Sequence, residues 1–202
     1  MRALPVSASV RSGNRRAMMS TAFEKTLAAF LNAISSAALK DVARHWGEAC
    51  KDGELASWKD LQPVAIKKHL PIVWSYDYDA ANDDFIGRLA GAKVTALSSG
   101  PFKGVRLSEI RPSDRYPRSL LRARRVANEP ALYRGHGLVY QSAESIGVGE
   151  RIVMPLRRDG NYPGGIFGAS EFQNSANWQN LSLNPNGEDE LWFSLEGTAP
   201  GD

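Results

Sequence analysis

The chain has 202 residues, of which 43% are hydrophobic and 23% are charged. This composition fits one globular domain with extensions, and the formal charge of +3 is too modest to mark the whole molecule as a polyanion binder. No apolar run approaches the roughly 20 residues needed to span a bilayer. The single cysteine, Cys50, excludes an intrachain disulfide. We therefore expect a cytoplasmic protein with no membrane partner.

The N-terminal part divides into two segments. Residues 1–19 are rich in Ser, Arg and Gly without an apolar period, which predicts a disordered arm. Residues 20–58 are predicted to be a helical segment, because apolar side chains then recur at helical spacing at Phe23, Leu27, Phe30 and Ile34. The pattern continues to Gly53, with Ser35 and Ser36 as the expected break between two helices.

A short helix is predicted from Leu61 to Leu70, where Pro71 ends it. Two strands follow, over Ile72–Tyr78 and Phe85–Gly91, and a hairpin is the simplest connection between them. Three helical segments come next: 93–97, 107–110, and a longer one capped by Ser113 or Asp114 that ends before Pro130.

Three further strands are predicted over Tyr133–Gln141, Glu150–Arg157 and Pro163–Phe172. The last two are joined at Asp159-Gly160, a tight-turn sequence. In the first of this pair, Arg151, Val153 and Pro155 alternate with Ile152, Met154 and Leu156, which predicts a hairpin with one buried face. Residues 174–202 are predicted to be a polar, acidic tail outside the fold.

Five short motifs occur in a fixed order along residues 39–172. They are W-x-x-A at Trp46, Leu70-Pro71, F-x-x-R-L-A-G at Phe85, G-x-x-L-x-E-I at Gly104 and M-P-L-x-x-D-G at Met154. Together with the order of helices and strands, they resemble an alphaproteobacterial PAS-like family. Gly100-Pro101-Phe102 departs from that pattern, which has a more polar turn at this place.

The resemblance implies an α+β fold, with a PAS-like five-stranded antiparallel sheet over 59–173, helices on one face, and a preceding N-terminal helix. It also implies a stand-alone sensor or adaptor in a histidine-kinase or second-messenger pathway. Such a module binds a small-molecule ligand or a signalling protein and has no catalytic residues. The fold alone names no ligand or cofactor.

A ligand pocket in this fold would lie between the sheet and the helices and be mostly apolar. Its candidate wall residues, which are equally candidates for plain core packing, are Trp74, Tyr76, Phe85, Leu89, Tyr133, Tyr140, Met154 and Phe167. Arg88, between Ile86 and Ala90, requires either a structural salt bridge or an anionic ligand. His136, between two glycines, is a ligand contact or a solvent-facing side chain.

Two further surfaces are candidate partner sites. The apolar stripe of Phe23, Leu27, Phe30 and Ile34 would build a homodimer if it does not fold back on the sheet. A basic stripe along the long helix is either a solvated face or a surface for an acidic partner or a nucleic-acid backbone; it consists of Arg115, Arg118, Arg122 and Arg125. A basic-stripe nucleic-acid-binding protein is the alternative hypothesis. It is the less favoured one, because nucleic-acid surfaces interleave aromatic residues with arginines and only Tyr116 is present here.

Catalysis is poorly supported by the sequence. His45, His69 and His136 are far apart, and no zinc-binding, phosphate-loop or serine-nucleophile motif is present. Cys50 has no evident base, and cysteine is more often a small buried hydrophobe than a nucleophile. We expect neither an enzyme nor a metal site.

Overall fold

The computed structural model describes residues 21–51, 54–96, 100–110, 116–141, 146–160, 164–175 and 188–195. The predicted arm over 1–19 and the predicted cap at Ser113 or Asp114 lie outside these residues. The described elements are a helix over residues 21–33, α2 (Ala37–Ala49), the 3₁₀ helix η1 (Pro63–Ile72), β1 (Val73–Asp79), β2 (Asp84–Ala90), α3 (Ala92–Thr95), α4 (Leu107–Ile110), α5 (Tyr116–Asn128), β3 (Ala131–Gln141), β4 (Ile146–Leu156), β5 (Gly165–Ser175) and β6 (Glu188–Ser194).

The fold is α+β and contains a six-stranded antiparallel sheet in the order β2-β1-β5-β4-β3-β6. The two predicted hairpins, β1–β2 and β4–β5, are both present. The sequence predicts five strands, and the sixth comes from the segment predicted to be a polar tail. Strand β6 pairs with β3 over seven residues, from Glu188 opposite Gly137 to Ser194 opposite Ala131.

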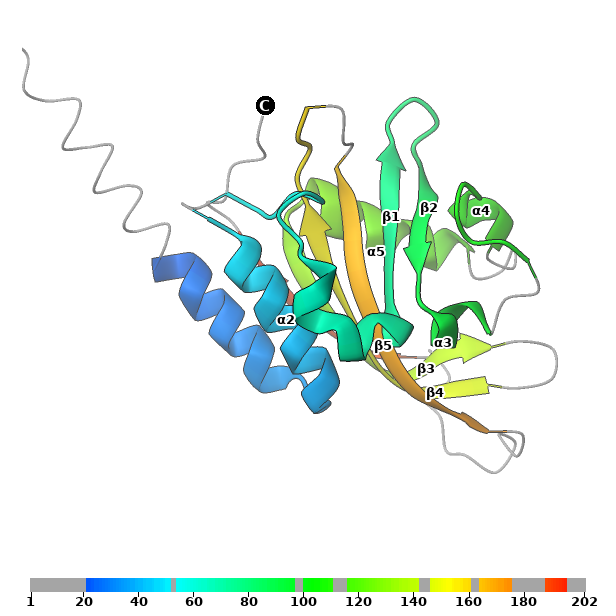
Figure 1. Cartoon of the computed structure of the whole chain (residues 1–202), viewed down its shortest axis with the longest axis horizontal. Coiled ribbons are helices and arrows are strands. Elements are labelled where there is room, and N and C mark those ends of the chain that lie inside the picture. The colour runs from blue at the N-terminus through cyan, green and yellow to red at the C-terminus, as the bar shows by residue number, and fades with distance from the viewer. Residues whose placement is uncertain are drawn as a thin grey trace, which may run out of the picture.

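Helices cover both faces of the sheet, whereas the sequence predicts helices on one face (Figure 1). The helix over residues 21–33 and α2 pack on one face, with η1 beside them, and α5 packs on the other. The hairpin β4–β5 is accordingly buried on both faces: Met154 belongs to the core under α2, and its neighbour Val153 belongs to the core under α5. The predicted alternation is confirmed, but the prediction of a single buried face is wrong.

The predicted helix break at Ser35 and Ser36 is confirmed. Ser36 has an extended backbone, and its hydroxyl accepts a hydrogen bond from the backbone N–H of Leu39 at 3.1 Å, so it caps α2. The two helices then pack side by side through the rings of Phe23 and Trp46, whose centroids are 6.0 Å apart. Trp46 is fully buried, and its indole N–H donates to the carbonyl of Pro155 at 2.8 Å.

Candidate functional site

The candidate ligand-binding residues do not line one pocket, because the sheet separates them. Most of them belong to the core under α5, namely Trp74, Tyr76, Phe85, Tyr133 and Tyr140. Met154 and Phe167 lie on the opposite face, in the core under α2. Any pocket between the sheet and α3, α4 and α5 would therefore exclude Met154 and Phe167.

The core under α5 is rich in aromatic rings that contact one another. The centroid of Tyr76 is 5.8 Å from that of Trp74 and 4.8 Å from that of Phe102, and Tyr140 and Phe172 are also 4.8 Å apart. These are the separations of packed aromatic pairs. The indole N–H of Trp74 also has a hydrogen-bond partner, because it donates to the hydroxyl of the buried Ser170 at 3.0 Å.

Arg151 is a buried charged residue beside this aromatic core, and it is not among the candidate site residues predicted from the sequence. Its side chain is only 6% exposed, its guanidinium lies 5.1 Å from the ring centroid of Tyr140, and it donates to the carbonyl of Val139. The alternation along this strand could have identified Arg151. It places the guanidinium on the same face as Val153, a face that also carries buried apolar side chains. A guanidinium beside an aromatic ring is suited to bind an anionic or aromatic group.

Arg88 forms a structural salt bridge, which is one of the two alternatives that the sequence left open for it. Its Nε lies 2.6 Å from Oδ1 of Asp77, and both side chains are half-buried. The guanidinium also lies over the ring of Trp58, 5.0 Å from the centroid. Leu89 and His136 are exposed, with Leu89 at 36%, so neither contributes to the aromatic core.

The N-terminal apolar stripe packs inside its own chain. Phe30 and Ile34 are buried, and Phe23 and Leu27 pack against the same core. Phe30 contacts Phe193 of β6, with centroids 5.5 Å apart. A homodimer through this stripe was expected only if the stripe did not fold back on the sheet, and in the structure it does fold back.

The basic stripe faces β6. Arg118 pairs with Glu190 at 2.9 Å, and Arg122 lies 3.9 Å from the same carboxylate and 4.6 Å from the ring centroid of Tyr133. Arg125 stacks on Trp192. Arg115 lies outside the described residues. The acidic surface that this stripe contacts is thus a strand of the same chain.

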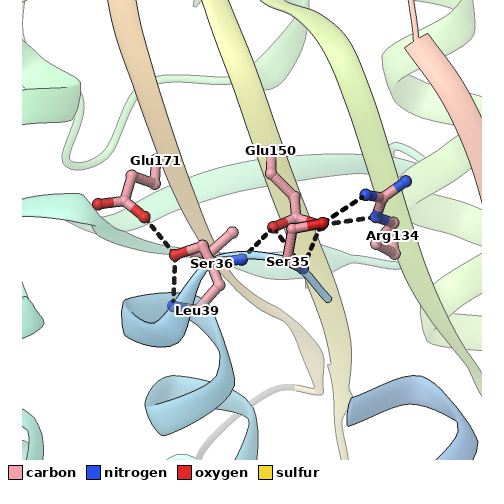
Figure 2. Close-up of polar contacts among 6 residues, drawn as sticks. All are labelled: Ser35, Ser36, Leu39, Arg134, Glu150 and Glu171. Atoms are coloured by element: carbon pink, nitrogen blue, oxygen red, sulfur yellow. Dashed lines mark hydrogen bonds and ion pairs between the residues drawn. The ribbon is translucent and has the colours of Figure 1, made fainter. Parts of the chain in front are cut away.

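A second polar cluster fixes the helices to the sheet, as Figure 2 shows. The carboxylate of Glu150, which is 4% exposed, accepts hydrogen bonds from the backbone N–H groups of Ser35 at 3.0 Å and Ser36 at 2.8 Å. It also accepts one from Nε of Arg134 at 2.7 Å. The hydroxyl of Ser36 donates to Glu171 on the neighbouring strand. Because every partner belongs to the chain itself, the cluster is a structural connection between helix and sheet.

Comparison with known proteins adds no relative: no family model matches the sequence, and neither a curated protein nor a solved structure matches it. Within the described ranges, no group of three or more His, Cys, Asp or Glu side chains is placed to hold a metal ion. None of the helices in the described part of the chain combines the length and the apolar character needed to cross a membrane.

Proposed function

We propose that this protein is a stand-alone PAS-like sensor or adaptor of the kind that serves histidine-kinase or second-messenger pathways. One observation carries the proposal: three helices inserted between β2 and β3 accompany an antiparallel sheet whose first five strands have the order β2-β1-β5-β4-β3. Two strands, a group of helices and then three strands is the order of elements that the resemblance to a PAS-like family implies. The strand β6 and the layer formed by α2 and the helix before it are additions to this unit.

The ligand form of the proposal places a small molecule in the aromatic core under α5. Trp74, Tyr76 and Tyr140 supply ring faces there, and Arg151 supplies a positive charge. Because these groups are already packed against one another, a ligand would enter by displacing side chains, for example by rotation of the Phe102 ring that lies over Tyr76. The adaptor form of the proposal needs no ligand and uses the outer surface to bind a signalling protein.

Native mass spectrometry of the purified full chain, with an absorbance spectrum of the same sample, tests the ligand form. A fixed extra mass that is lost on denaturation would support a sensor. Replacing Ser170 by Ala should then reduce the loaded fraction, because its hydroxyl lies beside Trp74 in the aromatic core, whereas Ser108→Ala, outside that core, should not.

If the protein carries no extra mass, only the adaptor form of the proposal is left. That form is tested by immobilising the chain and measuring whether it retains a histidine kinase or a second-messenger enzyme. Failure of both measurements would contradict the proposed function. A homodimer remains part of the proposal, and light scattering of the full chain measures it. Deletion of residues 1–36 is unsuitable for that purpose, because it removes the buried Phe30 and Ile34.

A further inference from the structure

A separate cavity lies at the end of the sheet where β1 and β4 end and β5 begins. Figure 1 shows this end of the sheet at its top. The volume of the cavity is about 400 Å³, which is within the range of about 300–1,000 Å³ typical of small-molecule sites. Two of its lining residues, Tyr78 and Ala127, pack against the edge of the aromatic core under α5. The cavity nevertheless shares none of the residues named for the ligand site proposed above.

The start of β5 contributes two glycines to the wall of this cavity. Gly164 and Gly165 lie between the ends of β1 and β4, and both line the cavity. A Cβ on Gly165 would lie 2.1 Å from the carbonyl oxygen of Tyr76, so only glycine allows β1 and β5 to approach this closely. Tyr78, Ala127 and Leu156 add apolar walls around the glycines.

The charges on the cavity wall favour an anion. Asp79 contributes a carboxylate to the cavity wall. This carboxylate is already bound by Arg106 at 2.9 Å and by the side-chain amide of Asn82 at 2.8 Å. Two arginines line the other side. The guanidinium of Arg157 lies near two carboxylates, with Asp60 at 3.5 Å from Nη2 and Glu54 at 3.7 Å from Nε. Its Nε–H is nevertheless buried without a hydrogen-bond acceptor among the described residues. Arg158 is exposed, and its side chain forms no ion pair with any residue that the structure describes.

We propose that this cavity binds a small molecule with a flat apolar body and one anionic group, a carboxylate, sulfonate or phosphate. The body lies on the glycines between Tyr78 and Leu156, and the anion lies at the guanidinium groups of Arg157 and Arg158. Arginine is suited to this role, because its planar fork of N–H groups matches the oxygens of such anions.

The test is an NMR titration of the full-length, amide-labelled protein with 2-naphthoate, using the neutral 2-naphthamide as the matched ligand. We expect 2-naphthoate to shift the amide signals of Gly164, Gly165 and Asn128, and 2-naphthamide to bind about tenfold more weakly. Arg158→Gln should weaken 2-naphthoate binding by about tenfold and leave 2-naphthamide unchanged. Lys103→Gln, which removes an exposed charge elsewhere, should change neither affinity.

Three results would overturn the proposal. Equal affinity for the acid and the amide would show that the cavity does not recognise charge. An unchanged affinity for 2-naphthoate in Arg158→Gln would show the same of Arg158. Shifts confined to Trp74, Tyr140 and Arg151 would place the ligand in the aromatic core instead. Because Arg158 is exposed, its replacement does not threaten folding. Ala127→Leu, which fills the cavity from α5, gives a second check and should abolish the shifts.

Discussion

The guanidinium of Arg125, on α5, lies over the indole ring of Trp192, on β6, at 4.1 Å from the ring centroid. Trp192 also contacts Tyr133 of β3, with ring centroids 4.8 Å apart. A basic helix and an acidic strand far from it in sequence are therefore held against each other. The contact helps to hold β6 at the edge of the sheet, and it gives the basic stripe an acidic strand of the same chain to pair with.

The first prediction concerns this contact. Trp192→Ala should lower the free energy of unfolding by about 1–2 kcal/mol, because it removes a half-buried ring and its stacking with Arg125. Urea denaturation measures the change. Leu191→Ala, at the neighbouring exposed position, is the matched control and should change stability by less than about 0.5 kcal/mol. An equal loss in both variants would show that the stacking is not what holds β6.

The second prediction concerns the buried carboxylate of Glu150. Glu150→Gln should lower the free energy of unfolding by about 3–5 kcal/mol, because it leaves the charge of Arg134 without its partner in a largely buried position. Glu171→Gln should cost much less, since Glu171 is exposed. In a double-mutant cycle, Arg134→Gln combined with Glu150→Gln should cost less than the sum of the two single changes. An additive result would mean that the pair does not interact.

The third prediction tests burial on both faces of the sheet. Val153 and Met154 are neighbours on β4, at 1% and 0% exposure, and belong to opposite cores. Replacing either with Ala should therefore destabilise the protein, by about 2 kcal/mol for Val153 and about 2–5 kcal/mol for Met154. Thermal or urea unfolding of both variants measures this. A negligible effect at Val153 would indicate a sheet covered on one face only.

The fourth prediction concerns acid sensitivity. Burial lowers the pKa of His45 below its ordinary value of 6.5, and the neutral ring accepts a hydrogen bond from the backbone N–H of Gln62 at 3.2 Å. Below pH 6.5 the unfolded chain binds a proton that the folded chain resists, so His45 makes stability fall as the pH falls through this range. Urea midpoints at pH 7.5 and 5.5 measure the fall. His45→Gln should make it smaller, and an unchanged fall would exclude His45 as a source.

The fifth prediction concerns Cys50. Burial raises the pKa of its thiol to about 12, and its sulfur accepts a hydrogen bond from the backbone N–H of Ala56 at 3.2 Å. Very little thiolate is therefore present near neutral pH. At pH 8, Ellman's reagent should react slowly with the native protein and rapidly in 6 M urea. Equally rapid reaction in both conditions would show that the thiol is accessible and ionisable in the folded state.

Local signals in the sequence determined several elements of the fold. The break at Ser35 and Ser36, the helix Leu107–Ile110 and the β4–β5 hairpin are present as predicted, because capping, helical period and turn chemistry act over a few residues. The salt-bridge interpretation of Arg88 was also available, because an arginine between apolar neighbours needs a partner.

The tertiary structure decided which distant segments meet. Alternation in β4 showed that its two sides differ, but not that α2 and α5 cover both of them. The seven residues of β6 lie within an acidic stretch, so only their pairing with β3 and the stacking of Trp192 on Arg125 reveal a strand. Burial and ion pairing depend on the approach of groups that are separated along the chain by tens of residues. A period or a motif, which the sequence displays directly, depends only on near neighbours.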